Sequence, residues 1–278
     1  MRGRSPAGLG HHGVPRSCHC ARECFTGAGG SGPLPVIGRH NTGVPMRLAV
    51  LILGITIVAT PMMGRAQQNA VVLELFTSQG CSSCPPADAL LPYFSEMPGV
   101  IALALHVDYW DYLGWKDSYG KGEFTERQKA YAKHLEQRML YTPQVVIQGQ
   151  QILIGHQEGK IKTMLSEYQA MPSPIHLEVT REGDQLAIKA DADGVVIDGP
   201  FDIQLVRFLD SEDVRIEAGE NAGHTLTYTH VVTDWETVGR WSGDEPFEDI
   251  IEAGPDDSLA VIVQKANTGP VVTAVELR

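Results

Sequence analysis

Cys81 and Cys84 are separated by two serines, and no other pair of residues in this 278-residue chain indicates chemistry as clearly. Thiols at this spacing can close into a small disulfide without movement of the backbone. Stabilisation of the fold does not explain such a bridge well, because so short a loop constrains little of the unfolded chain. Thiol–disulfide exchange explains it better, since unpaired N–H groups and the dipole at a helix start would stabilise a Cys81 thiolate.

The segment before this pair predicts export. Residues 46–66 have the features of a signal peptide: a basic Arg47, an apolar stretch over 48–59 and small residues before a cleavage point after Ala66. An uncleaved N-terminal anchor is the alternative. Residues 1–45 are then a non-native or disordered leader, rich in Gly, Pro, Arg and His.

Three further cysteines fall in that leader. With nearby histidines they offer a possible metal cluster: Cys18, Cys20, Cys24, His11, His12 and His19. The segment has no apolar periodicity to fold it, so we interpret these residues as part of the leader. The exported chain then keeps a single close cysteine pair, which is unlike a disulfide-stabilised scaffold.

Charge excludes some partners. The first 66 residues hold seven of the 22 Lys and Arg and one of the 34 acidic residues, so the remainder has a net charge of −18. Such a surface repels nucleic acid and anionic lipid. We expect no nucleic-acid partner and no stable membrane insertion after signal cleavage.

The elements around the cysteines alternate in type. Strands are predicted at 71–76, 100–107, 144–147 and 152–154, and helices at 81–97 (kinked at Pro92), 123–138 and 161–168. The first two strands and the helix between them form a βαβ unit, so these strands should be parallel. The order is βαβ-α-ββα.

This order, with the cysteine pair at the first strand-to-helix turn, resembles a thioredoxin fold. Cys81 and Cys84 match the redox pair, Thr142-Pro143 the family's cis-proline, and Gly155 a glycine that faces the pair. The segments 76–88, 106–117 and 141–144 resemble more narrowly a bacterial family of secreted thioredoxin-like proteins, known chiefly as a domain of unknown function. Gly80 and Ser82-Ser83 depart from the usual residues around the cysteines, so the direction of electron flow does not transfer.

Topology predicts which groups meet. Chemistry gathers at the carboxyl ends of parallel strands. That edge should hold Cys81, His106, Asp108, Pro143 and His156.

Roles follow from this placement. Cys81 should be the attacking thiolate and Cys84 the resolving thiol. Asp108 is either the group that assists proton transfer from Cys84 or a helix or loop cap. The resemblance implies that Thr142 and a cis Pro143 bind an extended substrate segment. Trp110, in an aromatic loop, lines a substrate groove or packs as a lid.

Two other function classes remain open. Cys81, Cys84, His106 and His156 would suit copper or zinc in an exported metal carrier. His106 lies in an apolar strand, however, and we interpret it as a hydrogen-bonded core histidine. The third class is a non-catalytic binding module with an inert disulfide.

The remainder of the chain predicts a second domain. Beyond the proline-rich 171–174 segment, strand-like runs occur at 175–180, 185–190, 201–209, 225–232, 259–265 and 271–276. Short strands at this density predict a β-sandwich. The polar segment 219–224 is interpreted as a hairpin loop. The division is therefore a thioredoxin-like domain over 70–172 and a β-sandwich domain over 175–278.

Together these observations predict a periplasmic or secreted thiol–disulfide oxidoreductase. It would act on protein or peptide thiols and disulfides. Its redox-active disulfide would serve in place of an organic cofactor.

Overall fold

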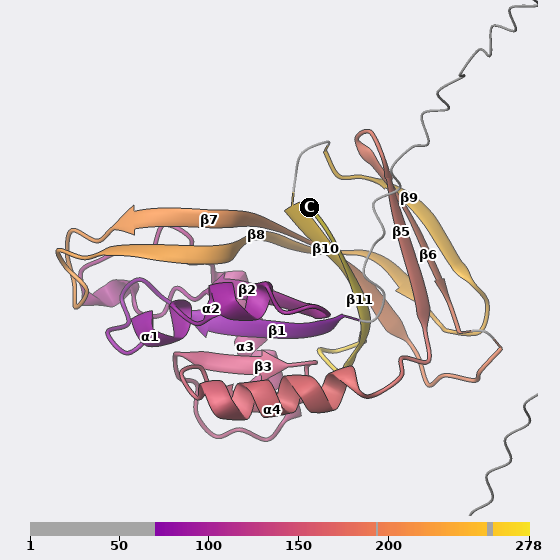
Figure 1. Ribbon diagram of the computed structural model, residues 1–278, viewed down its shortest axis with the longest axis horizontal. Helices are drawn as coiled ribbons and strands as arrows, with labels where there is room; N and C mark the ends of the chain where they lie inside the picture. The colour runs from indigo at the N-terminus through magenta and orange to yellow at the C-terminus, as the bar shows by residue number, and fades with distance from the viewer. Residues whose placement is uncertain (1–69, 193, 255–257) are drawn as a thin grey trace, which may run out of the picture. The chain divides into compact units, whose positions relative to one another are not determined.

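The computed structural model describes residues 70–192, 194–254 and 258–278. Two sheets hold most of this part of the chain, and its helices are few (Figure 1). The larger sheet has eight strands in the order β11-β10-β7-β8-β2-β1-β3-β4, and the smaller has three in the order β5-β6-β9. The described chain is therefore mostly β, with a mixed sheet that both halves of the sequence build.

The first half contains the four predicted strands and four α-helices, one more than predicted because two short helices occupy the place of the first predicted one. The strands are β1 Val71–Thr77, β2 Val100–His106, β3 Gln144–Ile147 and β4 Gln151–Ile154. The helices are α1 Pro85–Asp88, α2 Leu91–Ser95, α3 Gly122–His134 and α4 Glu158–Gln169, with a short 3-10 helix, η1, at Asp111–Leu113. Each strand lies within one residue of its predicted bounds.

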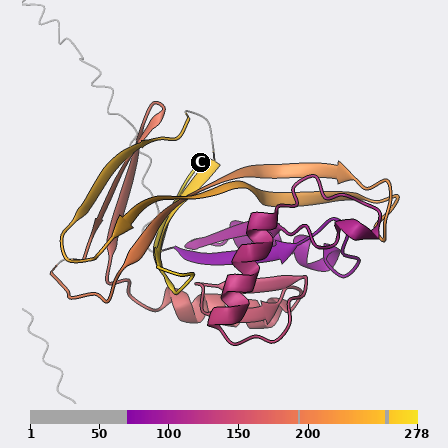
Figure 2. The same ribbon diagram turned by 180° about the vertical axis from the view of Figure 1, so that it is seen from behind.

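Strands β1 and β2 form the centre of this half. They pair in parallel from Val71↔Val100 to Thr77↔His106, and every residue of both is buried. Burial on both faces explains why each reads as an almost continuous apolar run. Helices α1, α2 and α4 share a core with one face of these strands, and α3 packs on the other face (Figures 1 and 2).

The helix predicted over 81–97 is wrong in its extent. The chain forms two short helices, α1 and α2, that are separated at Ala89 and Leu90. Pro92 explains the break, because its nitrogen has no hydrogen and its ring clashes with the carbonyl four residues earlier. The pair of cysteines precedes α1 and is not part of a helix.

The second half contains seven strands. They are β5 His176–Glu182, β6 Gln185–Asp191, β7 Phe201–Arg215, β8 Thr225–Trp241, β9 Phe247–Glu252, β10 Ser258–Lys265 and β11 Val271–Leu277. Strand β9 was not predicted, since it is acidic and largely exposed. Strands β7 and β8 are far longer than predicted and form one antiparallel hairpin.

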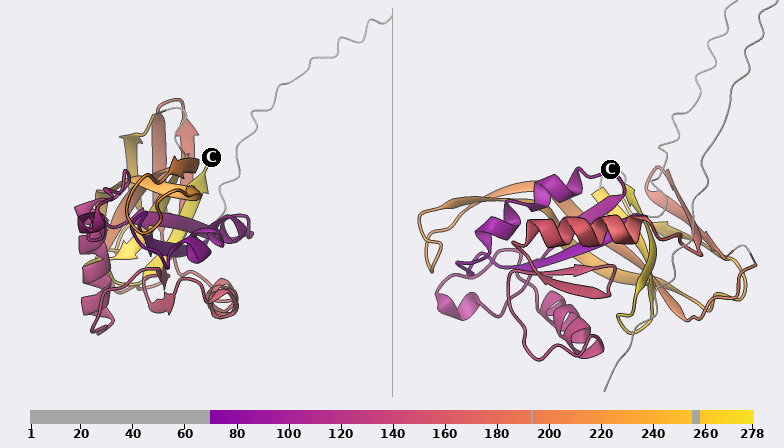
Figure 3. Two further views of the ribbon diagram at one scale, coloured as in Figure 1. Left: turned by 90° about the vertical axis from the view of Figure 1, so that its left-hand side faces the viewer. Right: turned by 60° about the horizontal axis from the view of Figure 1, so that its bottom comes forward.

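The predicted sandwich corresponds to the packing of the three-stranded sheet on β7, β10 and β11 through an apolar core. It is not a separate pair of sheets, because β8 also pairs in parallel with β2 through Ala104↔Val231. The β7–β8 hairpin runs beyond the sandwich alongside α1 and α2 (Figure 3). The predicted boundary at 171–174 lies between α4 and β5, and the division into two domains there stays a prediction.

A buried ion pair ties the two halves together. The Arg127 guanidinium of α3 donates to the Glu74 carboxylate of β1 from Nε at 2.7 Å and from Nη2 at 2.9 Å. The same guanidinium reaches Gln264 of β10 at 3.1 Å and lies 3.7 Å from the ring centre of Trp235 on β8. Tyr131 completes the network by donating to Glu74 at 2.6 Å. Removing one charge would leave the other buried without a counter-ion.

Candidate functional site

The cysteine pair lies in the turn that follows β1. Cys81 and Cys84 form a disulfide, with their Cα atoms 5.4 Å apart. The turn is held by its own backbone: the Cys81 N–H donates to the Ser78 carbonyl at 3.1 Å, and the Cys84 N–H donates to the Cys81 carbonyl at 3.2 Å. The predicted position of the pair, at the carboxyl end of the first strand, is the observed one.

The predicted stabilisation of Cys81 by a helix start does not fit the structure. Helix α1 has only four residues, and Cys84 occupies its N-cap. Its first two residues, Pro85 and Pro86, have no N–H. The N–H groups of Ala87 and Asp88 both donate to the Cys84 carbonyl. No free N–H of α1 is therefore left for the Cys81 sulfur. Instead, the sulfur lies 3.4 Å from the Ser83 hydroxyl.

Both cysteines are buried. Cys81 is 2 % exposed and Cys84 is fully buried, whereas the two serines between them are exposed. An attacking thiolate must approach a sulfur directly, so exchange at this disulfide requires its neighbours to move.

The Thr142-Pro143 segment lies beside the pair, as predicted. The bond between these residues is cis. The Ser83 hydroxyl donates to the Thr142 carbonyl at 3.3 Å, and the indole N–H of Trp110 donates to the Thr142 hydroxyl at 2.7 Å. Gly155 lies against the same place, because a Cβ there would be 2.8 Å from the Cβ of Pro143. The structure thus brings together Cys81, Thr142, Pro143 and Trp110.

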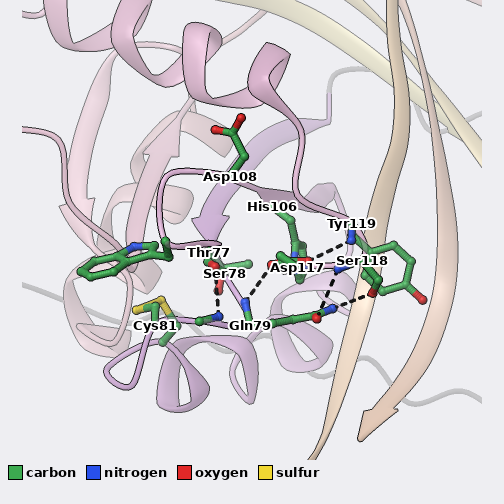
Figure 4. A network of polar contacts seen from close by, with 12 residues as sticks. Thr77, Ser78, Gln79, Cys81, His106, Asp108, Asp117, Ser118 and Tyr119 are labelled. Atoms are coloured by element: carbon green, nitrogen blue, oxygen red, sulfur yellow. Dashed lines mark hydrogen bonds and ion pairs between the residues drawn. A yellow bond between two sulfur atoms is a disulfide. The ribbon is translucent and has the colours of Figure 1, made fainter. Parts of the chain in front are cut away.

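His106 is the core histidine that the sequence favoured. It is fully buried, and its Nδ1 lies 2.8 Å from the Asp117 carboxylate. Asp117 also accepts from the backbone N–H groups of Gln79 and Tyr119 (Figure 4). Burial would raise the pKa of Asp117, but these hydrogen bonds outweigh it and lower the pKa. Because a carboxylate can only accept, Nδ1 of His106 carries the hydrogen.

Asp88 is the carboxylate nearest to Cys84 in the chain, and sequence reasoning gave it no role. It lies four residues after Cys84, which places it one helical turn further on. Asp88 is 5 % exposed and accepts from the Thr77 hydroxyl at 2.6 Å. Burial raises the pKa of this carboxyl from 3.8 to about 7, against the lowering effects of Thr77 and His106. The sequence signal that could have revealed Asp88 is an acidic residue within the otherwise apolar segment that follows the cysteines.

Three side chains that interact electrostatically each have a buried polar atom without a hydrogen-bond partner in the described chain: Asp88 Oδ2, His106 Nε2 and the Tyr228 hydroxyl oxygen. The rings of His106 and Tyr228 are 4.7 Å apart between centres. Tyr228 comes from β8, so the second half of the chain contributes to this cluster. Groups of this kind are suited to holding or moving protons.

Asp108 does not join the cluster. Its carboxylate accepts from the Thr125 hydroxyl of α3 at 2.6 Å and is directed away from the disulfide (Figure 4). These contacts fit the cap that we considered beside the proton-transfer role. His156 is exposed, and His106 uses Nδ1 for Asp117. No group of three potential metal ligands occurs in the part of the chain that the structure describes.

A loop of the second half contacts the cysteine turn. The side-chain amide of Asn221, in the connection between β7 and β8, donates to the Gln79 carbonyl at 2.9 Å and to the Cys81 carbonyl at 3.0 Å. The sequence predicted this connection as a loop but not its location, because nothing local indicates a contact with residues about 140 positions earlier.

The fold and the site define a mixed, β-rich protein with a buried disulfide in the turn after its first strand. The chain belongs to a family described as "Protein of unknown function (DUF1223)", whose model matches residues 72–264. This membership bears out the predicted resemblance to a family of unknown function. No curated protein matches the sequence.

Two solved structures are similar to this one. A crystal structure of a protein from Agrobacterium tumefaciens is 32% identical, with a TM-score of 0.64, and the match covers 74% of this chain and 93% of that one. HBP35 of Porphyromonas gingivalis is 16% identical, with a TM-score of 0.57 and coverage of 76% and 75%, and shows a shared fold.

The predictions for residues 1–66 lie outside the described residues. These are the leader, the signal peptide and the possible cluster around Cys18, Cys20 and Cys24. Within the described ranges, no helix has both the length and the apolar character needed to cross a membrane.

Proposed function

We propose that the chain is an exported thiol–disulfide oxidoreductase with a thioredoxin-like first half, acting on protein or peptide thiols and disulfides. One observation carries this proposal: segments about 60 residues apart place the Cys81–Cys84 disulfide beside Thr142 and Pro143. A disulfide that served only as a brace would gain little from so short a loop.

The chemistry is a two-step exchange. A substrate thiolate attacks the Cys81 sulfur, the Cys81–Cys84 bond breaks, and its electron pair leaves on the Cys84 sulfur. A second substrate thiolate then attacks the sulfur that is bound to Cys81 and releases the Cys81 thiolate. The protein gains two electrons and two protons, and the substrate dithiol becomes a disulfide. The same steps in reverse oxidise the protein.

Asp88 is the group that we assign to the Cys84 proton, in place of Asp108. It is buried one helical turn after Cys84, and its raised pKa lets it both give and take a proton near neutral pH. Thr142 and Trp110 flank the cysteine turn on the side of the exposed Ser83, where a substrate segment would bind.

A trapping experiment tests the proposal. Cys84→Ser should accumulate a mixed disulfide with a peptide disulfide: the Cys81 thiolate attacks one peptide sulfur, the other leaves as a thiolate, and no resolving thiol remains to release the adduct. Cys81→Ser is the matched control and should trap far less, because Cys84 is the resolving thiol in the proposed exchange. Equal and negligible trapping by both folded variants, with a wild-type disulfide that resists excess dithiol, would show an inert bridge. Stoichiometric copper binding by the reduced protein without exchange would favour the metal carrier.

A further inference from the structure

The loop over the cysteine turn has a defined shape. Residues 216–224, which we name the 216–224 loop, are closed by backbone bonds from the Ile216 N–H to the His224 carbonyl and from the Gly223 N–H to the Ile216 carbonyl. Gly219 has a φ of +76° and lies against Trp115, where a Cβ would be 3.1 Å from the Trp115 Cβ. Glycine suits this position because it adopts positive φ without strain and leaves room for the tryptophan.

Asn221 is the buried polar side chain of this loop, and Ile216 at its start is buried as well. Asn221 is 6 % exposed, while its neighbours Glu220 and Ala222 are exposed. Its amide nitrogen has two hydrogens, and both are used by the carbonyls of Gln79 and Cys81. A buried amide without these partners would be costly, so the side chain is matched to this backbone segment.

These contacts fall on the residue that exchange must expose. Cys81 is 2 % exposed, and Asn221 bonds its carbonyl. The loop lies at the end of a long hairpin and carries exposed residues on its outer side, which is typical of segments that open without unfolding the rest. The other half of the molecule thus bonds the backbone of the residue whose sulfur must become accessible.

We propose that the 216–224 loop is a lid over Cys81, that Asn221 latches it to the cysteine turn, and that its release precedes attack on the disulfide. This inference rests on the proposed function for its biological meaning, and access to the disulfide can be measured without it. Partners that displace the lid would be reduced or oxidised, and thiols that cannot would be excluded.

The test is the rate at which dithiothreitol reduces the Cys81–Cys84 disulfide under native conditions. The reagent's two thiols supply both electrons and both protons and end as its cyclic disulfide. Asn221→Ala should be reduced roughly tenfold faster than the wild type, because two buried hydrogen bonds no longer hold the lid. Glu220→Gln, an exposed neighbour in the same loop, should keep the wild-type rate. Equal rates for folded Asn221→Ala and the wild type would overturn the proposal.

A second control separates lid opening from general destabilisation. Val275→Ala weakens the apolar core between the two sheets, far from the lid in the chain, and should leave the reduction rate unchanged. Acceleration of this variant to the same degree would contradict the lid. If Asn221→Ala does not fold, hydrogen exchange of the wild type decides: the Gly223 amide should be less protected than amides of β10, and equal protection would overturn the proposal.

The two proposals can fail separately. Faster reduction of Asn221→Ala together with no trapping by Cys84→Ser would keep the lid and reject the exchange activity. Trapping by Cys84→Ser with no effect of Asn221 would do the reverse.

Discussion

Two buried regions of this molecule differ in chemistry. Between the three-stranded sheet and β7, β10 and β11, the core consists of apolar side chains. Behind the cysteine turn, the interior instead holds Thr77, Asp88, His106 and Asp117, with Tyr228 from β8. Buried polar groups lower stability unless they are fully paired, and three atoms of this cluster have no partner in the described chain. The first region stabilises the fold, and the second has the composition of a functional site.

The ion pair between Glu74 and Arg127 lies inside a core but is fully partnered, and it should give the largest effect. Arg127→Met should lower the free energy of unfolding by about 3–5 kcal/mol, because the Glu74 carboxylate would stay buried without a counter-ion. Urea denaturation measures this. The double variant Glu74→Leu with Arg127→Met is the control and should recover most of the loss. A double variant that is as unstable as the single one would show that packing, not charge, is what Arg127 supplies.

The apolar region should respond in stability alone. Ile188→Ala removes a fully buried side chain from the core between the sheets and should cost roughly 2–5 kcal/mol. The reduction potential of the Cys81–Cys84 pair should stay at its wild-type value, because no polar group near the cysteines changes. We would measure both on the same preparation. A shifted potential would mean that the two regions are coupled.

The polar cluster should respond to pH, and a substitution there should raise the free energy of unfolding, whereas the two substitutions above lower it. Asp88 has its pKa raised to about 7 by burial, so its neutral form is favoured in the folded state. Below pH 3.8 the carboxyl is neutral in both states. As pH rises toward 7 the unfolded state loses its proton first, and stability falls. Asp88→Asn removes this effect and should raise the free energy of unfolding at pH 8 by up to about 4 kcal/mol, with little effect at pH 4.

The control for this pH effect is Ile188→Ala, because it changes a buried side chain that carries no titratable group. Its stability should differ from the wild type by the same amount at pH 4 and pH 8. Denaturant unfolding of the oxidised protein at the two pH values decides. A pH-independent difference for Asp88→Asn would indicate that folding does not raise the pKa of Asp88.

Local patterns predicted the first half well. The strand bounds followed from apolar runs, and the meeting of Cys81 with Pro143 followed from the rule that parallel strands end at one edge. The burial of His106 followed from its apolar strand. The prediction of one long helix after the cysteines was wrong, because the effects of Pro85, Pro86 and Pro92 together outweigh the apolar spacing.

The remaining features depend on contacts between distant segments. The pairing of β2 with β8 joins Ala104 to Val231, and the latch joins Asn221 to Cys81. The sequence around each contact does not indicate its partner. For the second contact, an asparagine between two glycines is typical of an ordinary turn. Asp88 was missed for the same reason: its burial comes from Thr77 and from strand β8, which lie elsewhere in the chain.

The continuity of the eight-stranded sheet has a consequence for dissecting the molecule. If the chain were ended after residue 172, β2 would lose β8 and its backbone would become a free edge of seven residues that are all buried in the intact protein. Open apolar edges recruit further strands, so the shortened protein should self-associate. In the intact protein, the C-terminal half would then protect the N-terminal half from aggregation by covering this edge.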